Sequence, residues 1–356
     1  MYDHLIKGKF DSLQLLRGIA ACVVVIFHEF GTYGLFKYGK YGVDLFFVLS
    51  GFIILYTHHT KIGEKKVLVP FILKRIIRVF PIYWFMTFVY ILLVSVSGFG
   101  STLSIDYVLK SLFLLPQDKL PVIGVAWTLE FEMLFYFIFG LLMFNRKILY
   151  TTLTLWGLTI IYFFIFPTAL PKAIEHIVSP LNLEFLFGCG IAVVVIKRKI
   201  SAEWMTRLGI ISIVTSLTLQ YFNILKINDA IAWGIPFSIL ILGLVSLEMK
   251  KRLNIPKTLI YLGNASYSIY LSHLITLLVL ESILEKLGLH KQYGHNGFVQ
   301  LTFSVVAIFL GCVFYSLVEK PLLKYVRSWF TNKKKVVDIE ININNSNSKK
   351  IGQSHI

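Results

Sequence analysis

The chain has 356 residues, of which 56% are hydrophobic, 15% aromatic and only 15% charged. A mean hydropathy of +0.73 excludes a soluble enzyme, because the surface of a domain folded in water needs more polar side chains than this chain has. A disordered chain is excluded on the same ground, and three cysteines within apolar segments are too few for a secreted disulfide scaffold.

A hydropathy window long enough to cross about 30 Å of hydrocarbon identifies ten apolar segments in the sequence. They are Leu13–Gly31, Gly42–Tyr56, Val79–Ser97, Val122–Phe144, Leu149–Phe166, Leu183–Ile196, Leu208–Phe222, Ala230–Leu247, Ala265–Leu280 and Phe298–Val318. The second, sixth and seventh are shorter than the usual ~20 residues, so we expect their helices to extend into flanking residues. The sequence therefore predicts an all-α, polytopic integral membrane protein with about ten transmembrane helices.

The basic residues are distributed unevenly between alternate connecting segments. With the amino terminus in the cytoplasm, 26 of the 35 Lys and Arg residues lie on the cytoplasmic side and 8 on the other, with Arg17 inside the first segment. This asymmetry predicts that both termini are cytoplasmic. It also accounts for the formal charge of +16 through membrane topology and contact with anionic lipids, so no nucleic acid partner is expected.

Residues 1–330 are predicted to form one transmembrane domain. Residues 331–356 are rich in Asn, Ser and Lys and are predicted to be a disordered cytoplasmic tail. The sequence contains no internal repeat, no glycine-rich phosphate loop and no metal-ligand cluster, so no metal cofactor is expected.

Ionisable residues inside the apolar segments cost about 2.5–3.5 kcal/mol each near the bilayer centre, so each needs a partner or a function. Arg17 and His28 are eleven positions apart in the first segment, which places them on nearly the same helix face with roughly 16 Å of rise between them. Each also has a structural interpretation. Arg17 fits a snorkelling anchor at the cytoplasmic surface, and His28 an interfacial residue bonded to a backbone carbonyl.

Two acidic residues are candidates to act with His28. Asp44 opens the second segment on the side where His28 is expected, so its carboxylate could orient or charge-stabilise an imidazole. Glu130 and Glu132 are two positions apart and face different directions, so at most one addresses a given site. Glu132 is expected near the middle of the membrane, where a structural ion pair with an arginine is the alternative to a catalytic role.

Arg75 and Arg78 share one helix face at the cytoplasmic entrance of the third segment, and each guanidinium offers the fork that suits phosphate oxygens. Neighbouring lysines also permit an ordinary positive-inside cluster. Ser268 and His273 are five positions apart, roughly 140° around a helix, and so are not a nucleophile–base pair. Glu319, at the end of the tenth segment, is interpreted as structural.

These stretches together resemble the membrane-bound acyltransferase family 3, which includes O-acetyltransferases of bacterial surface polysaccharides such as O-antigen. Arg17-x10-His28 is similar to the family's basic-x10-His signature, and Arg75-x-x-Arg78 to its paired-arginine signature. The stretches Gly42–Phe52, Trp127–Tyr136 and Tyr267–His273 resemble its other recurrent blocks. The resemblance covers roughly residues 10 to 330.

The resemblance implies an enzyme of the bacterial inner membrane that takes an acyl group, usually acetyl, from cytoplasmic acetyl-CoA to a hydroxyl of a surface or lipid-linked glycan. Arg75 and Arg78, with Arg17, are then expected to bind the donor. We hypothesise that His28 is the general base and that Asp44 or Glu132 orients it. Succinyl or another short acyl group, and a covalent acyl-enzyme, remain open alternatives.

A second class of protein also fits ten segments with buried Arg, His, Asp and Glu residues. Proton-coupled transporters and polysaccharide flippases carry such residues along their substrate pathways. The lack of repeat symmetry and of paired Gly/Pro-broken helices in the sequence argues against them. A signalling or scaffold protein would leave the buried charges without a function.

Overall fold

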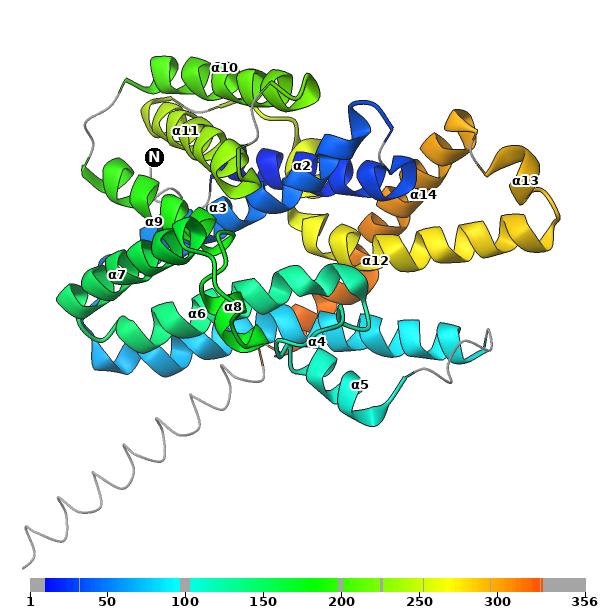
Figure 1. The fold of residues 1–356 in the computed structure, drawn as a ribbon, viewed down its shortest axis with the longest axis horizontal. Helices are drawn as coiled ribbons and strands as arrows, with labels where there is room; N and C mark the ends of the chain where they lie inside the picture. The colour runs from blue at the N-terminus through cyan, green and yellow to red at the C-terminus, as the bar shows by residue number, and fades with distance from the viewer. Residues whose placement is uncertain are drawn as a thin grey trace, which may run out of the picture.

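A computed structural model describes residues 10–31, 33–96, 103–197, 201–224, 227–251, 253–294, 296–326 and 328 (Figure 1). Within these ranges the protein is helical and contains no β-strand. The α-helices are α2 (Asp11–Phe30), α3 (Gly42–His58), α4 (Leu68–Val96), α5 (Ile105–Leu112), α6 (Trp127–Leu142), α7 (Arg146–Ile165), α8 (Lys172–Ile177), α9 (Asn182–Lys197), α10 (Ala202–Tyr221), α11 (Asp229–Lys250), α12 (Lys257–Lys286), α13 (His290–Tyr293) and α14 (Gly297–Phe314). Short helical turns are η1 (Phe36–Tyr41), η2 (Lys65–Val67) and η4 (Gly124–Ala126), and a π-helical turn, η5 (Tyr315–Glu319), follows α14. The predicted tail, 331–356, lies outside the described residues.

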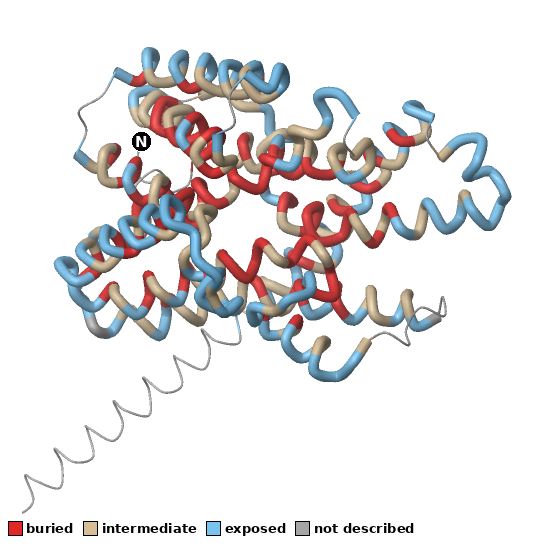
Figure 2. Tube along the Cα trace, viewed as in Figure 1, coloured by how far each residue is buried: buried red, intermediate tan, exposed pale blue. Residues whose placement is uncertain are grey.

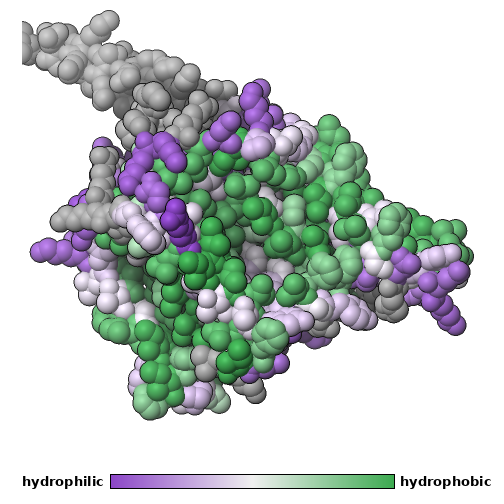
Figure 3. Space-filling view, turned by 90° about the horizontal axis from the view of Figure 1, so that it is seen from above, coloured by the Kyte–Doolittle hydropathy of each residue, from purple (hydrophilic) through white to green (hydrophobic). Residues whose placement is uncertain are grey.

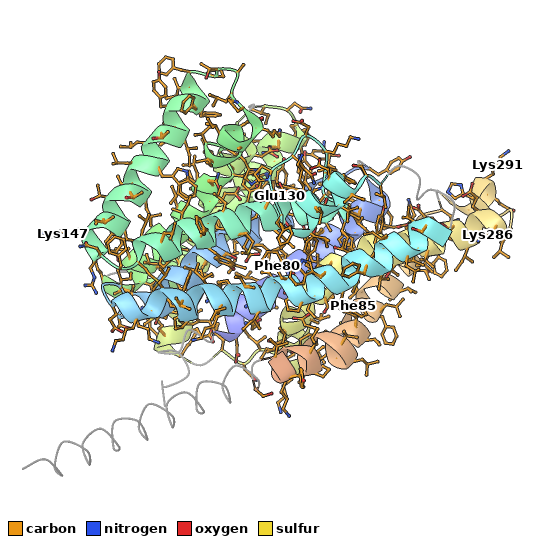
Figure 4. The ribbon with its side chains drawn as sticks, turned by 90° about the horizontal axis from the view of Figure 1, so that it is seen from below. Phe80, Phe85, Glu130, Lys147, Lys286 and Lys291 are labelled. Atoms are coloured by element: carbon orange, nitrogen blue, oxygen red, sulfur yellow. The ribbon has the colours of Figure 1, made fainter. Side chains whose placement is uncertain are left out.

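In the described part of the chain, nine helical segments are long and apolar enough to cross a membrane. The second and sixth predicted segments extend as expected, to Phe36–His58 and Lys172–Lys197. These findings confirm a polytopic all-α membrane protein. Several long helices, among them α4, α6 and α12, lie near the long axis of the molecule (Figure 1), and Lys147 and Lys286 lie toward its opposite ends (Figure 4).

The seventh predicted segment lies in α10, which is not among those nine. α10 nevertheless runs antiparallel along most of α11. Lys250 Nζ lies 3.7 Å from Glu203 at one end of the pair, and Trp233 Nε1 donates to Gln220 Oε1 at the other (3.1 Å). Its 20 residues span about 30 Å. The seventh predicted segment therefore lies beside α11 along most of its length.

The outer surface of the protein is apolar, as a protein that faces lipid requires. Exposed apolar side chains cover the outer helices, among them Leu155, Leu158 and Ile165 of α7. Figure 3 shows hydrophobic side chains over a broad face, with hydrophilic ones toward its edges. Figure 2 shows the buried residues gathered where the helices meet. Backbone groups inside this layer are satisfied within the helices, as hydrocarbon demands.

The central helix is α3, which is buried along nearly its whole length. It packs against α9 at a pair of glycines. A Cβ on Gly51 would lie 2.0 Å from the Phe185 carbonyl oxygen, and one on Gly188 would lie 2.2 Å from that of Val48. Only glycine permits this approach, which membrane helices use to bring their backbones together.

Candidate active site

α2 and α12 are held in one register by a second glycine contact. A Cβ on Gly263 would lie 2.0 Å from the Gln14 carbonyl oxygen, and one on Gly18 would lie 3.0 Å from the Gly263 nitrogen. The two helices run in the same direction from this point. The register brings Arg17 to Ser266, where Arg17 Nη2 donates to Ser266 Oγ at 3.0 Å, and it brings His28 to His273 farther along.

His28 and His273 form a pair at the end of α2. Their ring centroids are 4.8 Å apart, and His273 Nε2 lies 3.2 Å from His28 Nδ1. His28 Nδ1 also lies 2.9 Å from the Val24 carbonyl oxygen, and His273 Nδ1 lies 3.3 Å from that of Ile269. His273 is fully buried, whereas His28 is exposed on one side. We call the end of the bundle where this pair lies the histidine end.

The contacts of the pair assign its tautomers. A carbonyl oxygen only accepts, so His273 Nδ1 carries a hydrogen toward Ile269 and its Nε2 is an acceptor in the neutral ring. His28 Nδ1 then carries the hydrogen that points to Val24 and His273. The remaining nitrogen of His28, Nε2, keeps an unprotonated lone pair on the exposed side of the ring. This is the arrangement that a general base requires.

Arg17, Arg75 and Arg78 gather near Glu132, and we call these three arginines the arginine cluster. Arg17 and Arg75 both lie close enough to Glu132 to interact with it electrostatically. Arg78 and Arg17 line a narrow cavity of about 50 Å³ together with Glu132. Three donor-site candidates from two helices that are distant in sequence are thus brought together.

Arg75 is packed between aromatic rings as well as near a carboxylate. Its guanidinium carbon lies 5.4 Å from the Phe71 ring centroid and 5.3 Å from that of Tyr136, distances typical of cation–π contacts. The Arg75 Nε atom is buried and has no hydrogen-bond partner among the described residues. Arg75 therefore points into the protein.

Glu132 lies in the arginine cluster. It accepts hydrogen bonds from Ser50 Oγ at 3.1 Å and from the Tyr136 hydroxyl. The interpretation of Glu132 as an arginine partner matches this position. The described contacts of the His28 ring nitrogens do not include Glu132. The neighbour of the His28 ring is His273, where a carboxylate was expected.

Asp44 lies in the first turn of α3 and is buried against Glu184 of α9. Glu184 is fully buried, and its carboxyl group interacts directly with that of Asp44. The described contacts of the His28 ring nitrogens do not include Asp44. Asp44 thus belongs to an acidic pair at the histidine end, beside the imidazole pair and separate from it.

The sequence interpretation missed three residues: His273 as the partner of His28, Glu184 as the partner of Asp44, and Glu319. The Ser268 hydroxyl donates to Glu319, whose carboxylate also interacts electrostatically with Arg17 and Arg78. Glu319 closes the π-helical turn η5, a feature frequent at functional sites. All three are ionisable residues in apolar segments, and that signal alone would have selected them.

Comparison with known proteins agrees with this architecture. The model of a family described as "Acyltransferase domain" matches residues 10–317. The exopolysaccharide production protein ExoZ of Rhizobium meliloti (strain 1021) is 30% identical over 320 residues, which cover 82% of this chain and 92% of ExoZ. Protein 2 in the picA locus of Rhizobium radiobacter is 36% identical over 77 residues, which cover 21% of this chain and 40% of that protein. No solved structure gives a significant match. The chain therefore belongs to the membrane-bound acyltransferase family 3.

Proposed function

We propose that this protein is an O-acyltransferase of the bacterial inner membrane that transfers an acyl group, most simply acetyl, from cytoplasmic acyl-CoA to a hydroxyl of a cell-surface or lipid-linked glycan. Family membership supports acyl transfer, and the similarity to ExoZ, an exopolysaccharide production protein, supports a polysaccharide acceptor. The observation that carries the proposal is the His28–His273 pair, because it leaves one imidazole nitrogen free to take a proton.

In the proposed reaction, His28 Nε2 removes the proton of the acceptor hydroxyl as that oxygen attacks the thioester carbonyl carbon. The carbon–sulfur bond breaks, and the CoA thiolate takes the proton from the His28 imidazolium. His28 Nδ1 donates to His273 Nε2 and to the Val24 carbonyl throughout, and both bonds strengthen when His28 carries a charge. General base assistance of this kind is typically worth about 10²- to 10⁴-fold.

The arginine cluster is the proposed donor site. Among the described residues, its three guanidiniums interact with two carboxylates, Glu132 and Glu319, which leaves an excess of positive charge for an anionic donor. Buried Nε atoms of Arg17 and Arg75 have no described partner, so donors remain available for phosphate oxygens. Arg17 and His28 share α2, separated by roughly 16 Å of helical rise, a distance suited to an extended pantetheine arm.

Binding of acetyl-CoA by calorimetry tests the donor assignment, using purified protein in lipid vesicles. We expect wild type and the exposed-lysine control Lys147→Ala to bind, and the double variant Arg75→Ala plus Arg78→Ala to lose binding. Succinyl-CoA and free CoA, measured in parallel, report the choice of acyl group. Absence of binding to folded wild-type protein would contradict an acetyl-CoA donor, and binding retained in the double variant would contradict the site.

A further inference from the structure

A second cavity lies away from the paired histidines. Its volume is about 440 Å³, within the range of roughly 300–1,000 Å³ typical of small-molecule sites. Phe131 of α6, Phe163 and Phe164 of α7, and His176 of α8 line it, together with the segment that joins α7 to α9. Figure 1 shows α8 beside α6 and α7 at this place. We call this space the α8 cavity.

Buried polar atoms without partners lie in or next to the α8 cavity. His176 is 8% exposed and its ring stacks on Phe131, with 3.7 Å between the centroids. Its Nε2 atom has no hydrogen-bond partner among the described residues, and neither has Oε1 of Glu130, which is also 8% exposed. Figure 4 shows Glu130 on α6, one residue before Phe131. Buried polar groups of native proteins are normally paired, so a ligand that pairs them is expected.

The backbone that carries His176 is held in place by three hydrogen bonds. The fully buried Asn182 donates from Nδ2 to the carbonyl oxygens of His176 at 2.8 Å and of Ile177 at 3.1 Å. Trp156 Nε1 donates to the Ile177 carbonyl at 2.8 Å. A six-residue helix is too short to be rigid alone, and these bonds fix its end. The imidazole is therefore presented in one orientation before any ligand arrives.

The chemistry of the cavity suits a sugar ring. Hydroxyl groups both donate and accept, so a sugar can pair the His176 nitrogen of the lining. The Glu130 carboxylate interacts with Lys172, another residue of the lining, and so lies next to the same space. The phenyl rings offer flat apolar surfaces to the C–H face of a pyranose. Lys172 is paired with Glu175 at 3.1 Å, so the lining has no unpaired cation to favour a phosphate.

From this we infer that the α8 cavity is a saccharide subsite that binds a neutral sugar unit of the acceptor glycan. The inference rests on the proposed acyltransferase function and adds a recognition site to it. Phe47 of α3 lies between the α8 cavity and the narrow cavity at the arginine cluster, since it contacts Phe131 with centroids 6.1 Å apart and also lines that narrow cavity. His28 is not among the residues that line the α8 cavity, so the subsite holds a sugar unit other than the one that is acylated.

Saturation-transfer NMR on the full-length protein in lipid nanodiscs tests the subsite. The probes are the methyl glycosides of glucose, galactose and N-acetylglucosamine. His176→Phe keeps the stacked ring and removes its nitrogens, and Lys291→Ala is the control, an exposed residue that does not line the cavity. We expect wild type and the control to bind at least one glycoside, and His176→Phe to bind it about tenfold more weakly, the usual effect of one lost hydrogen bond.

A second variant and a second assay separate the possible failures. Glu130→Gln preserves side-chain volume and should also weaken binding, while His28→Gln should bind the glycoside normally and lose acyl transfer. Unchanged binding in folded His176→Phe and Glu130→Gln, or no binding in wild type, overturns the subsite. Glycoside binding that depends on His176 in a protein that transfers no acyl group would instead overturn the proposed function alone.

Discussion

The histidine pair and the arginine cluster both hold ionisable side chains inside the protein, but with different kinds of partner. Both place ionisable groups of α2 inside the membrane layer, and both use α12 as a neighbour. The two histidine rings hydrogen-bond to each other, and each ring also contacts one backbone carbonyl oxygen. No carboxylate is among their described partners. The arginines are surrounded by aromatic rings, hydroxyls and two carboxylates.

Under the proposed function, this difference would separate proton transfer at the histidine pair from anion binding at the arginine cluster. A neutral pair of imidazoles can gain a proton with little rearrangement, because the hydrogen bond between the rings already points the right way. A cluster with excess positive charge holds a fixed anion and exchanges no protons near neutral pH. Substitutions at the two sites should therefore affect different steps.

The largest expected effect is at His28. His28→Gln removes the lone pair that we assign as base, so acyl transfer should fall by about 10²- to 10⁴-fold. Donor binding should remain at the wild-type level, because the arginine cluster is untouched. Radiolabelled acetyl transfer to membrane glycan, measured beside acetyl-CoA calorimetry, checks both expectations. Transfer within twofold of wild type would remove His28 from the chemistry.

The second largest effect is expected at Gly263, because its contact with α2 sets the positions of both Arg17 and His28. A Cβ here would meet the Gln14 carbonyl oxygen at 2.0 Å, so Gly263→Val should destabilise the protein by about 1–3 kcal/mol and weaken both donor binding and transfer. Thermal unfolding in detergent measures the loss. Gly190→Ala is the matched control, since a Cβ at Gly190 meets nothing within 4 Å and should leave the melting temperature unchanged or higher.

The His273 substitution sharpens the comparison further. His273→Phe keeps the ring but loses the acceptor for His28 Nδ1, and should lower kcat by about 10- to 100-fold, since a hydrogen bond to a charged group is worth about 1.5–3 kcal/mol. The KM for the acyl donor should stay constant. His273→Asn, whose amide oxygen can accept, should restore part of the rate. Equal defects in the two variants would reduce His273 to a packing residue.

A smaller effect is expected from Arg78→Lys. The charge is kept and the planar fork is lost, so affinity for acetyl-CoA should fall by about tenfold or less while kcat at saturating donor holds. Steady-state kinetics over a range of donor concentrations separates the two parameters. A fall in kcat alone would assign Arg78 to the reaction centre instead.

The smallest effect is expected at the α10–α11 surface. Lys250→Ala removes a 3.7 Å ion pair with Glu203, both side chains being about half exposed, and should change neither melting temperature nor transfer measurably. A clear loss of stability would show that α10 depends on this contact for its place beside α11. The variant also serves as a baseline for the changes above.

The periodicity of the sequence predicted most of the fold. Nine of the ten apolar segments coincide with membrane-length helices, and the tenth lies in α10, whose pairing with α11 was not visible from hydropathy. Hydrophobic periodicity is a local property, so a sequence window detects it. The partners of a helix depend on residues far away in the chain, as with Gly18 and Gly263, which the sequence interpretation did not single out.

The sequence by itself determined that the protein is a polytopic helical membrane protein of the acyltransferase type, and it selected Arg17, His28, Arg75 and Arg78 by their spacing. Only the tertiary structure decided which buried ionisable groups meet: His28 with His273, Asp44 with Glu184, and Glu132 with the arginine cluster. The physical reason is that spacing along a helix fixes the face on which a residue lies. Which neighbour that face meets is set by close packing between helices at glycines and small residues.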